Sequence, residues 1–249
     1  MIKCIVIPCY NEETRLPQEE YKSFLETQHD TRICFVNDGS SDKTLIVLNE
    51  LKSLFPEKIN VLDLRNNQGK AEAVRQGVQF CNQHFDHELI AYLDADLATT
   101  LEECNRLMAF ITPEIQFVFG SRILKIGSKI ERGKFRFLVG RMIATVISNI
   151  LNLKVYDTQC GCKIFTKDVS HTLFKESFLS TWLFDVELFK RYVLMYGHEE
   201  AQKKMLEVPL KSWIDKGESK VNMTYFFRMW WDLFQINRAY NSKTKSENH

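Results

Sequence analysis

The sequence predicts an α/β fold in which a mostly parallel central sheet is flanked by helices, and two patterns in its first half support this class. Five short segments are nearly continuous in apolar residues, as strands of a parallel sheet are when both faces are buried. They lie at 2–7, 32–36, 59–64, 88–93 and 115–120. Helical spacing alternates with them, which is typical of parallel α/β sheets. These helices are expected at 42–54, 69–84 and 99–111.

Polar or glycine-rich loops follow all five predicted strands, at the edge where parallel sheets bind ligands. They read PCYNEE, NDGSSDKT, RNNQGKAEA, DADLATT and GSR. One such loop would be weak evidence, whereas five at the same edge predict a single site.

The second half has a different pattern, with longer helices and fewer strands. We expect a long amphipathic helix, a strand, a helix, an edge strand and a closing aromatic helix, at 133–152, 160–165, 179–197, 205–212 and 223–240. The fourth segment is placed at an edge because its proline disfavours a central position in a sheet.

The composition excludes a general attraction to nucleic acid, because 33 basic and 32 acidic residues leave a net charge of +1. Apolar residues make up 45% and charged residues 26% of the chain, which is typical of a soluble globular protein. The seven cysteines are an odd number and several lie in apolar segments, which favours a reduced, cytoplasmic protein. The chain has no apolar run long enough to span a bilayer.

Asp94 and Asp96 follow the fourth predicted strand and are separated by a single residue. If residues 94–96 stay extended, both side chains point to the same side, because side chains alternate along a strand. Two carboxylates this close repel each other unless a cation lies between them, and oxygen ligands suit Mg²⁺ or Mn²⁺. The alternative, in which Asp96 caps a helix and Asp94 forms an ion pair, is disfavoured by the position at a strand end.

Two further strand ends carry residues suited to binding a nucleotide. Asp42 is explained as a helix cap, which leaves Asp38 free to accept a hydrogen bond from a nucleobase. Gly69 and Lys70 lie at an expected helix N-terminus, where backbone N–H groups and the helix dipole favour an anion. The alternative for Gly69 is a flexible link.

Together these loops resemble glycosyltransferase family 2, the inverting enzymes with the GT-A fold. The resemblance covers about residues 2–222 and continues through YDTQCGCKIF, WLFDVELF and EVPLKSWIDKGESKVN. This fuller set is similar to the branch that contains dolichyl-phosphate glucosyltransferases and bacterial polyprenyl-phosphate glycosyltransferases. We therefore expect one GT-A domain at 1–241, with a nucleotide-sugar half at about 1–122, an acceptor half at about 123–241 and a disordered tail at 242–249.

The resemblance also implies roles for the motif residues. Asp94 and Asp96 would hold a divalent cation that bridges the donor pyrophosphate, and Arg122 would contact the phosphate of the acceptor or product. The nucleotide sugar would be held by Pro8, Tyr10, Asn11, Glu12, Asp38, Lys70, Asp94, Ala95 and Asp96. The implied reaction moves a hexose from a nucleotide sugar of the UDP-glucose type to a polyprenyl or dolichyl phosphate.

The acceptor decides whether the reaction needs a general base. A phosphate is already an anionic nucleophile, whereas a saccharide hydroxyl needs a base, for which Asp157, Asp185 and Glu187 are the candidates. For Glu187 a solvent-facing helix position is an equally good interpretation. Transfer to a saccharide hydroxyl is thus the alternative function. A non-catalytic nucleotide-sugar-binding protein is a second alternative, which the intact aspartate pair disfavours.

Residues 122–141 carry the strongest local charge bias, because seven are Lys or Arg and one is Glu. This segment and the apolar helix after it predict binding to an acceptor phosphate or to anionic lipid headgroups, in a peripheral contact at the inner face of the membrane. The alternative is a solvated basic loop followed by a core helix. The aromatic helix at 223–240 poses the same choice between a membrane interface and core or dimer packing.

Overall fold

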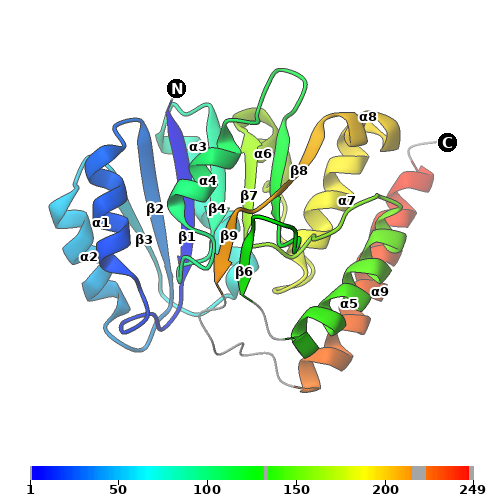
Figure 1. The fold of residues 1–249 in the computed structure, drawn as a ribbon, viewed down its shortest axis with the longest axis horizontal. Helices are drawn as coiled ribbons and strands as arrows, with labels where there is room; N and C mark the ends of the chain where they lie inside the picture. Colours follow the sequence, from blue (N-terminus) through cyan, green and yellow to red (C-terminus); the bar gives the residue numbers. More distant parts are fainter. Residues whose placement is uncertain (1, 132–133, 215–222, 247–249) are drawn as a thin grey trace.

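A central sheet of seven strands organises the part of the chain that the structure, a computed structural model, describes: residues 2–131, 134–214 and 223–246 (Figure 1). The strand order is β3-β2-β1-β4-β7-β5-β8. All neighbouring strands are parallel except β7, which runs antiparallel to β4 and β5. The strands are β1 (Lys3–Cys9), β2 (Thr31–Asp38), β3 (Ile59–Leu64), β4 (Leu89–Leu93), β5 (Phe117–Ser121), β7 (Cys162–Thr166) and β8 (Met205–Pro209). A separate parallel pair joins β6 (Lys129–Glu131) to β9 (Ser212–Ile214).

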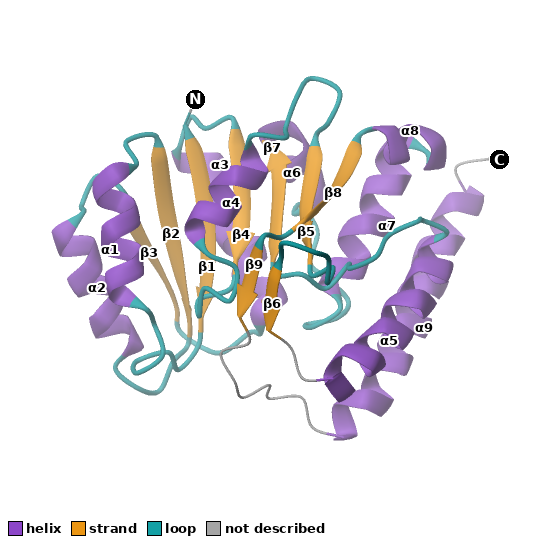
Figure 2. Cartoon of the chain, in the orientation of Figure 1, coloured by secondary structure: helices purple, strands orange, loops and turns teal. Residues whose placement is uncertain are grey.

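Helices cover both faces of the sheet, and each face has its own apolar core (Figure 2). One core is formed with α1 (Gln18–Thr27), α2 (Thr44–Leu54) and α4 (Leu101–Met108). The other is formed with α3 (Lys70–His84), α5 (Lys134–Leu151), α6 (Lys167–Leu173), α7 (Phe184–Tyr196), α8 (His198–Lys203) and α9 (Met223–Ser246). The sheet is therefore buried on both sides, which explains why its strands are nearly continuous in apolar residues.

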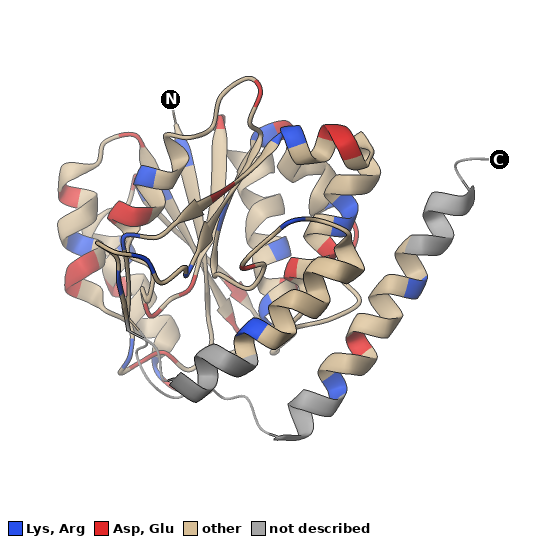
Figure 3. Cartoon of the chain, turned by 45° about the vertical axis from the view of Figure 1, so that its right-hand side comes forward, with Lys and Arg blue, Asp and Glu red and all other residues tan. Residues whose placement is uncertain are grey.

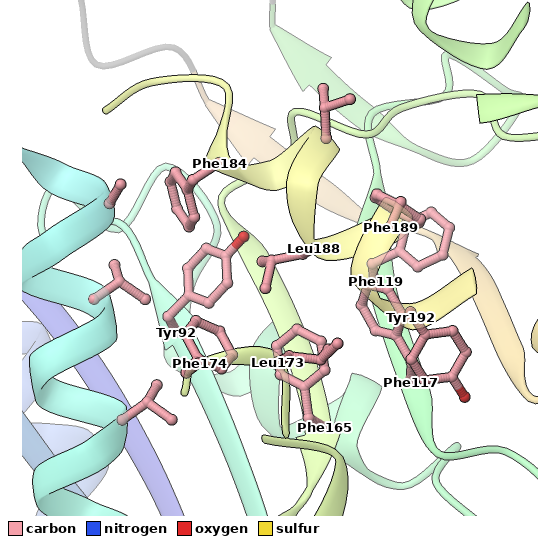
Figure 4. Packing of buried hydrophobic residues seen from close by; sticks show 14 of the residues in the cluster. Tyr92, Phe117, Phe119, Phe165, Leu173, Phe174, Phe184, Leu188, Phe189 and Tyr192 are labelled. Carbon is pink, nitrogen blue, oxygen red and sulfur yellow. The ribbon is translucent and has the colours of Figure 1, made fainter. Parts of the chain in front are cut away.

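Aromatic side chains fix α7 on the sheet (Figure 4). The ring of Phe117 on β5 stacks on Phe165 of β7, with 4.6 Å between centroids, and lies 5.1 Å from Phe189 of α7. Tyr92 on β4 lies 5.5 Å from Phe184, the first residue of α7. The first turn of α7 therefore has a fixed position relative to the end of β4.

The expected strands are confirmed, including the strand at 160–165 and the edge position of the segment with the proline, which is β8. The strand expected at 205–212 ends at Pro209, however, and Ser212 begins β9 in the separate pair. The helix expected from residue 99 begins at Leu101, because the Thr100 side chain caps it by accepting from the Glu103 N–H. The helix expected from residue 179 begins only at Phe184. Among the helices of the described residues, α1, α6 and α8 were not expected from the sequence.

The last helix, α9, packs one face on the core with the buried residues Met229, Leu233, Ile236 and Tyr240. It continues to Ser246, so the expected disordered tail from residue 242 is wrong for its first five residues; 247–249 lie outside the described part. The reason is cooperativity: extending a helix that is already packed costs far less than nucleating one. None of the described helices is both long and apolar enough to cross a membrane.

Candidate active site

The two aspartates of the fourth strand end lie in a tight turn. β4 ends at Leu93, and the Leu97 N–H donates to the Asp94 carbonyl at 3.2 Å. Leu97 has a φ of +51°, a left-handed conformation that is uncommon for a residue with a side chain. The expectation that residues 94–96 stay extended is therefore wrong, because the chain reverses here before α4 begins.

The turn nevertheless brings the two carboxylates into one electrostatic environment. Burial raises the pKa of Asp96, and the neighbouring Asp94 carboxylate raises it further. Asp96 accepts from the Ala98 N–H at 3.0 Å, and Asp94 forms an ion pair with Lys70 at 2.5 Å. This pair of close, partly exposed carboxylates has the chemistry that a divalent cation requires.

Two protein carboxylates fit a cation that completes its coordination with substrate oxygens. No cluster of three or more His, Cys, Asp or Glu residues in the described chain could hold a metal by itself. Mg²⁺ is commonly bound by one or two carboxylates, with phosphate oxygens and water as its other ligands. The residues present fit such an ion when a nucleotide is bound.

The loop after β1 is held against the loop after β2. Asn11, whose φ is +52°, accepts from the Ser41 N–H at 2.9 Å with its side chain, and its own N–H donates to Ser40 Oγ at 3.0 Å. The Glu12 N–H donates to Thr44 Oγ1 at 2.7 Å. Pro8, the penultimate residue of β1, and the exposed Tyr10 come just before this junction, so these residues share one edge of the sheet.

Arg15, which the sequence did not single out, connects this first loop to the aspartate turn. Its guanidinium lies 3.7 Å from the Glu12 carboxylate and 3.8 Å from that of Asp96. Behind the turn, Ala95 is buried and its carbonyl accepts from the Tyr21 hydroxyl at 3.0 Å. Glu12 and Ala95 are thus brought to the same place as Asp96, as expected.

Asp38 lies deeper than we expected. Its side chain is buried, and its two oxygens accept from the N–H groups of Gln68 and Gly69 at 2.8 and 2.9 Å. Burial raises the pKa of this carboxyl, and the two backbone donors oppose the increase. The most direct role of Asp38 is to fix the turn before α3, where Gly69 has a φ of +89°.

Lys70, the first residue of α3, is the cation nearest to the aspartate turn. Although its burial opposes the charged form, the carboxylates of Asp94, Asp185 and Asp96 raise its pKa. The expected neighbourhood of Lys70 and the two aspartates is therefore observed, and it also contains Asp185.

Arg122 and Asp157 form a bidentate ion pair. Arg122 donates from Nε and Nη2 to the two carboxylate oxygens at 2.7 and 2.8 Å, and its backbone N–H donates at 3.1 Å. Burial would raise the pKa of Asp157, but the Arg122 guanidinium holds it at about 2. The guanidinium also lies 5.3 Å from the ring centroid of Trp213. Asp157 is therefore already committed as the partner of Arg122.

Asp185 accepts two hydrogen bonds on one oxygen, from the Tyr92 hydroxyl and from Lys163 Nζ at 2.6 Å. The Lys163 ammonium is completely buried and also donates to the Cys160 carbonyl at 2.7 Å. Sequence reasoning missed Lys163, although a lysine inside an apolar strand is a signal, because a buried charge needs a partner.

Glu187 has a structural role in this fold. It is completely buried, so the solvent-facing interpretation is wrong. Its carboxylate accepts from the N–H groups of Leu179 and Ser180 at 3.1 and 2.9 Å and from the Tyr240 hydroxyl at 3.1 Å. These donors account for the late start of α7, because they hold residues 179–183 as a loop, and they leave Glu187 poorly placed to act as a base.

The basic segment at 122–141 is partly committed to the protein itself. Arg141 donates to the Tyr156 carbonyl at 2.8 Å and lies 3.5 Å from the centroid of that ring, while Arg122 is paired as described. Lys125 and Lys129 are exposed. The side chains of Arg132, Lys134 and Arg136 lie outside the described residues.

Comparison with known proteins identifies the family that this chain resembles. The model of glycosyl transferase family 2 matches residues 4–174. A dolichyl-phosphate beta-glucosyltransferase of Trichomonas vaginalis is 32% identical over 93% of this chain and 69% of that protein. The enzyme of the same name from Drosophila melanogaster is 31% identical over 93% of this chain and 73% of its own length.

Solved structures show the same fold at low sequence identity. Glucosyl-3-phosphoglycerate synthase from Mycobacterium tuberculosis, in complex with Mn²⁺, UDP-glucose and phosphoglyceric acid, is 14% identical. The match covers 96% of this chain and 79% of that chain, with a TM-score of 0.69. The expected GT-A fold is thus confirmed, and the chain belongs to glycosyl transferase family 2.

Proposed function

We propose that this family 2 glycosyltransferase moves glucose from UDP-glucose to a polyprenyl phosphate in a single inverting displacement. The relatives from Trichomonas vaginalis and Drosophila melanogaster are dolichyl-phosphate beta-glucosyltransferases. The synthase from Mycobacterium tuberculosis, which has the same fold, binds UDP-glucose in its solved structure. The nucleotide sugar would lie over residues 1–122, and the acceptor would approach over residues 123–241.

We infer the class of acceptor from the hydrogen bonds that the three candidate bases already make. Asp157 is engaged by Arg122 through both oxygens, and Glu187 is buried under three donors. Asp185 already accepts two hydrogen bonds on one oxygen, and its side chain is only 7% exposed. A phosphate oxygen is anionic and needs no base, whereas a saccharide hydroxyl does. The same commitment of the carboxylates counts against the saccharide alternative.

In this proposal Asp94 and Asp96 hold a Mg²⁺ or Mn²⁺ ion. When bound, such an ion supplies Lewis-acid stabilisation of the charge that develops on the leaving nucleoside diphosphate. Tyr10, Asn11, Glu12 and the other residues of the first loop would bind the nucleoside, and Lys70 would donate to the pyrophosphate. Arg122, whose Nε and Nη2 are held by Asp157, would offer Nη1 to the acceptor phosphate.

We also propose that α9 brings the enzyme to a membrane surface. Trp230, Trp231 and Phe234 of α9 are 40–59% exposed; we call these three residues the aromatic face. Trp231 and Phe234 lie away from the buried face of the helix, and Trp230 lies at its flank. Figure 3 shows the charged residues of the described part of α9 as separate bands along the helix; they are Arg228, Asp232 and Arg238. Tryptophan is favoured at the boundary between water and lipid, so this surface suits peripheral contact with the bilayer that carries the acceptor.

The proposed reaction predicts transfer of labelled glucose from UDP-glucose to a short-chain polyprenyl phosphate in the presence of Mg²⁺ or Mn²⁺. The Asp96→Ala variant should lose activity, because one of the two carboxylates that hold the cation is missing. Wild type with EDTA should also lose activity, because the chelator removes the cation. Transfer to free saccharides but not to the lipid phosphate would refute the acceptor class. Tight binding of UDP-glucose without turnover on any acceptor would favour the non-catalytic alternative.

Lys70→Met should change the binding of cation and nucleotide in opposite directions. Mn²⁺ alone should bind more tightly, because the ammonium beside Asp94 no longer competes with it. UDP-glucose should bind about tenfold more weakly, the value of one charge-assisted hydrogen bond of roughly 1.5 kcal/mol. Mn²⁺ electron paramagnetic resonance and calorimetry measure the two affinities. Lys22→Met, which removes an exposed pairing with Glu19, is the control, and parallel changes in both affinities would contradict the expectation.

Asp157→Asn tests whether Asp157 acts as the partner of Arg122. Its pKa is about 2 in the fold and about 3.9 in an unfolded chain. The stabilisation is therefore complete above about pH 4 and is lost as the pH falls through about 2; it amounts to roughly 2–3 kcal/mol. In urea titrations the variant should be less stable than wild type at pH 7, and the difference should shrink between pH 4 and pH 2. A difference that does not depend on pH would exclude this role.

The double variant Trp231→Ala, Phe234→Ala should weaken co-sedimentation with anionic lipid vesicles by at least about tenfold, since burial of a Phe side chain contributes roughly 1.5–3 kcal/mol. Ile46→Ala, Leu54→Ala is the matched control, because it removes two equally exposed apolar side chains from α2. Transfer to a water-soluble, short-chain acceptor should stay unchanged in both. Equal vesicle binding by wild type and the aromatic-face variant would show that α9 does not contact lipid.

A further inference from the structure

The segment Cys160-Gly161-Cys162 has no role in the proposed function so far, yet it lies directly beside the aspartate turn. In the antiparallel pairing of β4 with β7, Leu93 is opposite Cys162. One step further along both chains, residue 94 is opposite residue 161. Facing residues of antiparallel strands are the closest side-chain neighbours in a sheet. The register therefore places Gly161 against Asp94.

The space next to Gly161 is filled by the Asp94 carboxylate. A Cβ atom at residue 161 would lie 2.0 Å from Asp94 Oδ2 and 2.4 Å from its Cγ, far inside van der Waals contact. The φ of Gly161 is not in the left-handed region, so backbone conformation alone does not require glycine here. The constraint on residue 161 comes from the side chain that it faces.

The backbone around Gly161 has little freedom to move away. Lys163 Nζ holds the Cys160 carbonyl at 2.7 Å and is itself held by Asp185 at 2.6 Å. Cys160 is buried, with its sulfur packed against Gly120, and Cys162 is buried in β7. A side chain added at residue 161 would therefore displace the carboxylate, which is the flexible end of Asp94, rather than the backbone.

On its other side Asp94 meets the Lys70 ammonium at 2.5 Å. The carboxylate thus lies between the Gly161 backbone and a cation. We propose that Gly161 is a positioning residue, whose missing side chain allows the Asp94 carboxylate to take the orientation in which it binds the divalent cation. This inference rests on the proposed function, because it assumes that Asp94 is a ligand of that cation.

The test is Gly161→Ala, measured by Mn²⁺ binding to the protein in the presence of UDP, whose phosphate oxygens complete the coordination of the ion. The variant should bind Mn²⁺ about 10–100-fold more weakly, as when an outer partner of a metal ligand is changed. Its thermal unfolding midpoint should stay close to that of wild type, since only a carboxylate has to rotate. Cys160→Ala is the neighbouring control: it removes a side chain that points at Gly120 and should keep wild-type Mn²⁺ affinity.

Combining Gly161→Ala with Asp94→Ala tests whether residue 161 affects Mn²⁺ binding through the Asp94 carboxylate. In that background Gly161→Ala should have no further effect on Mn²⁺ binding, because the group it displaces is gone. An additional loss in the double variant, or wild-type Mn²⁺ affinity in Gly161→Ala, would overturn the inference. If Gly161→Ala fails to fold, Asp94→Ala should restore folding, and failure of both variants to fold would overturn it. A wild-type protein that binds no Mn²⁺ even with UDP present would instead refute the metal role in the proposed function, and this inference with it.

Discussion

Lys163 places a completely buried ammonium in the middle of the sheet, and that charge can remain there only with partners close by. Asp185 from α7 and the Cys160 carbonyl are these partners. The requirement fixes the register of β7 against β4, because a slip of one residue would turn Lys163 to the opposite face of the sheet. The same register sets Gly161 against Asp94, so a buried ion pair and the geometry of the aspartate turn depend on each other.

Besides the longer contacts of Arg15, three hydrogen-bonded pairs of a cation and a carboxylate lie at this end of the described sheet: Lys70 with Asp94, Lys163 with Asp185 and Arg122 with Asp157. They differ in exposure. The Asp94 side chain is 38% exposed, whereas those of Asp157 and Asp185 are 10% and 7% exposed. A buried pair is costly to break, because the remaining charge is left without compensation, while an exposed pair can exchange partners cheaply. The two buried pairs therefore form the framework, and Asp94 with Lys70 is the pair that can respond to a ligand.

Much of the fold and part of the site could be predicted from the sequence, because strand patterning and the polar loops at strand ends are local signals. The strands of the first half and the grouping of Asp94, Asp96 and Lys70 follow from them. The extended geometry of residues 94–96 and the exposure of Glu187 were wrong, since a turn and a set of loop donors decided them. Gly161 and Lys163 were missed because their meaning depends on the pairing of β4 with β7, which joins distant segments and leaves no local pattern.

The arrangement of charge also bears on the choice of nucleophile. A general base must have a lone pair free to take the substrate proton. Donors occupy both oxygens of Asp157 and both oxygens of Glu187. Asp185 is held through one oxygen by Lys163 and Tyr92, and its side chain is only 7% exposed. The pairs of Arg122 with Asp157 and Lys163 with Asp185 also fix the backbone at this edge of the sheet. Breaking one of them to free a base would therefore weaken the framework that orients Asp94. A nucleophile that arrives already ionised avoids this conflict. For a site built in this way, a phosphate acceptor is the choice that the stability of the fold itself favours.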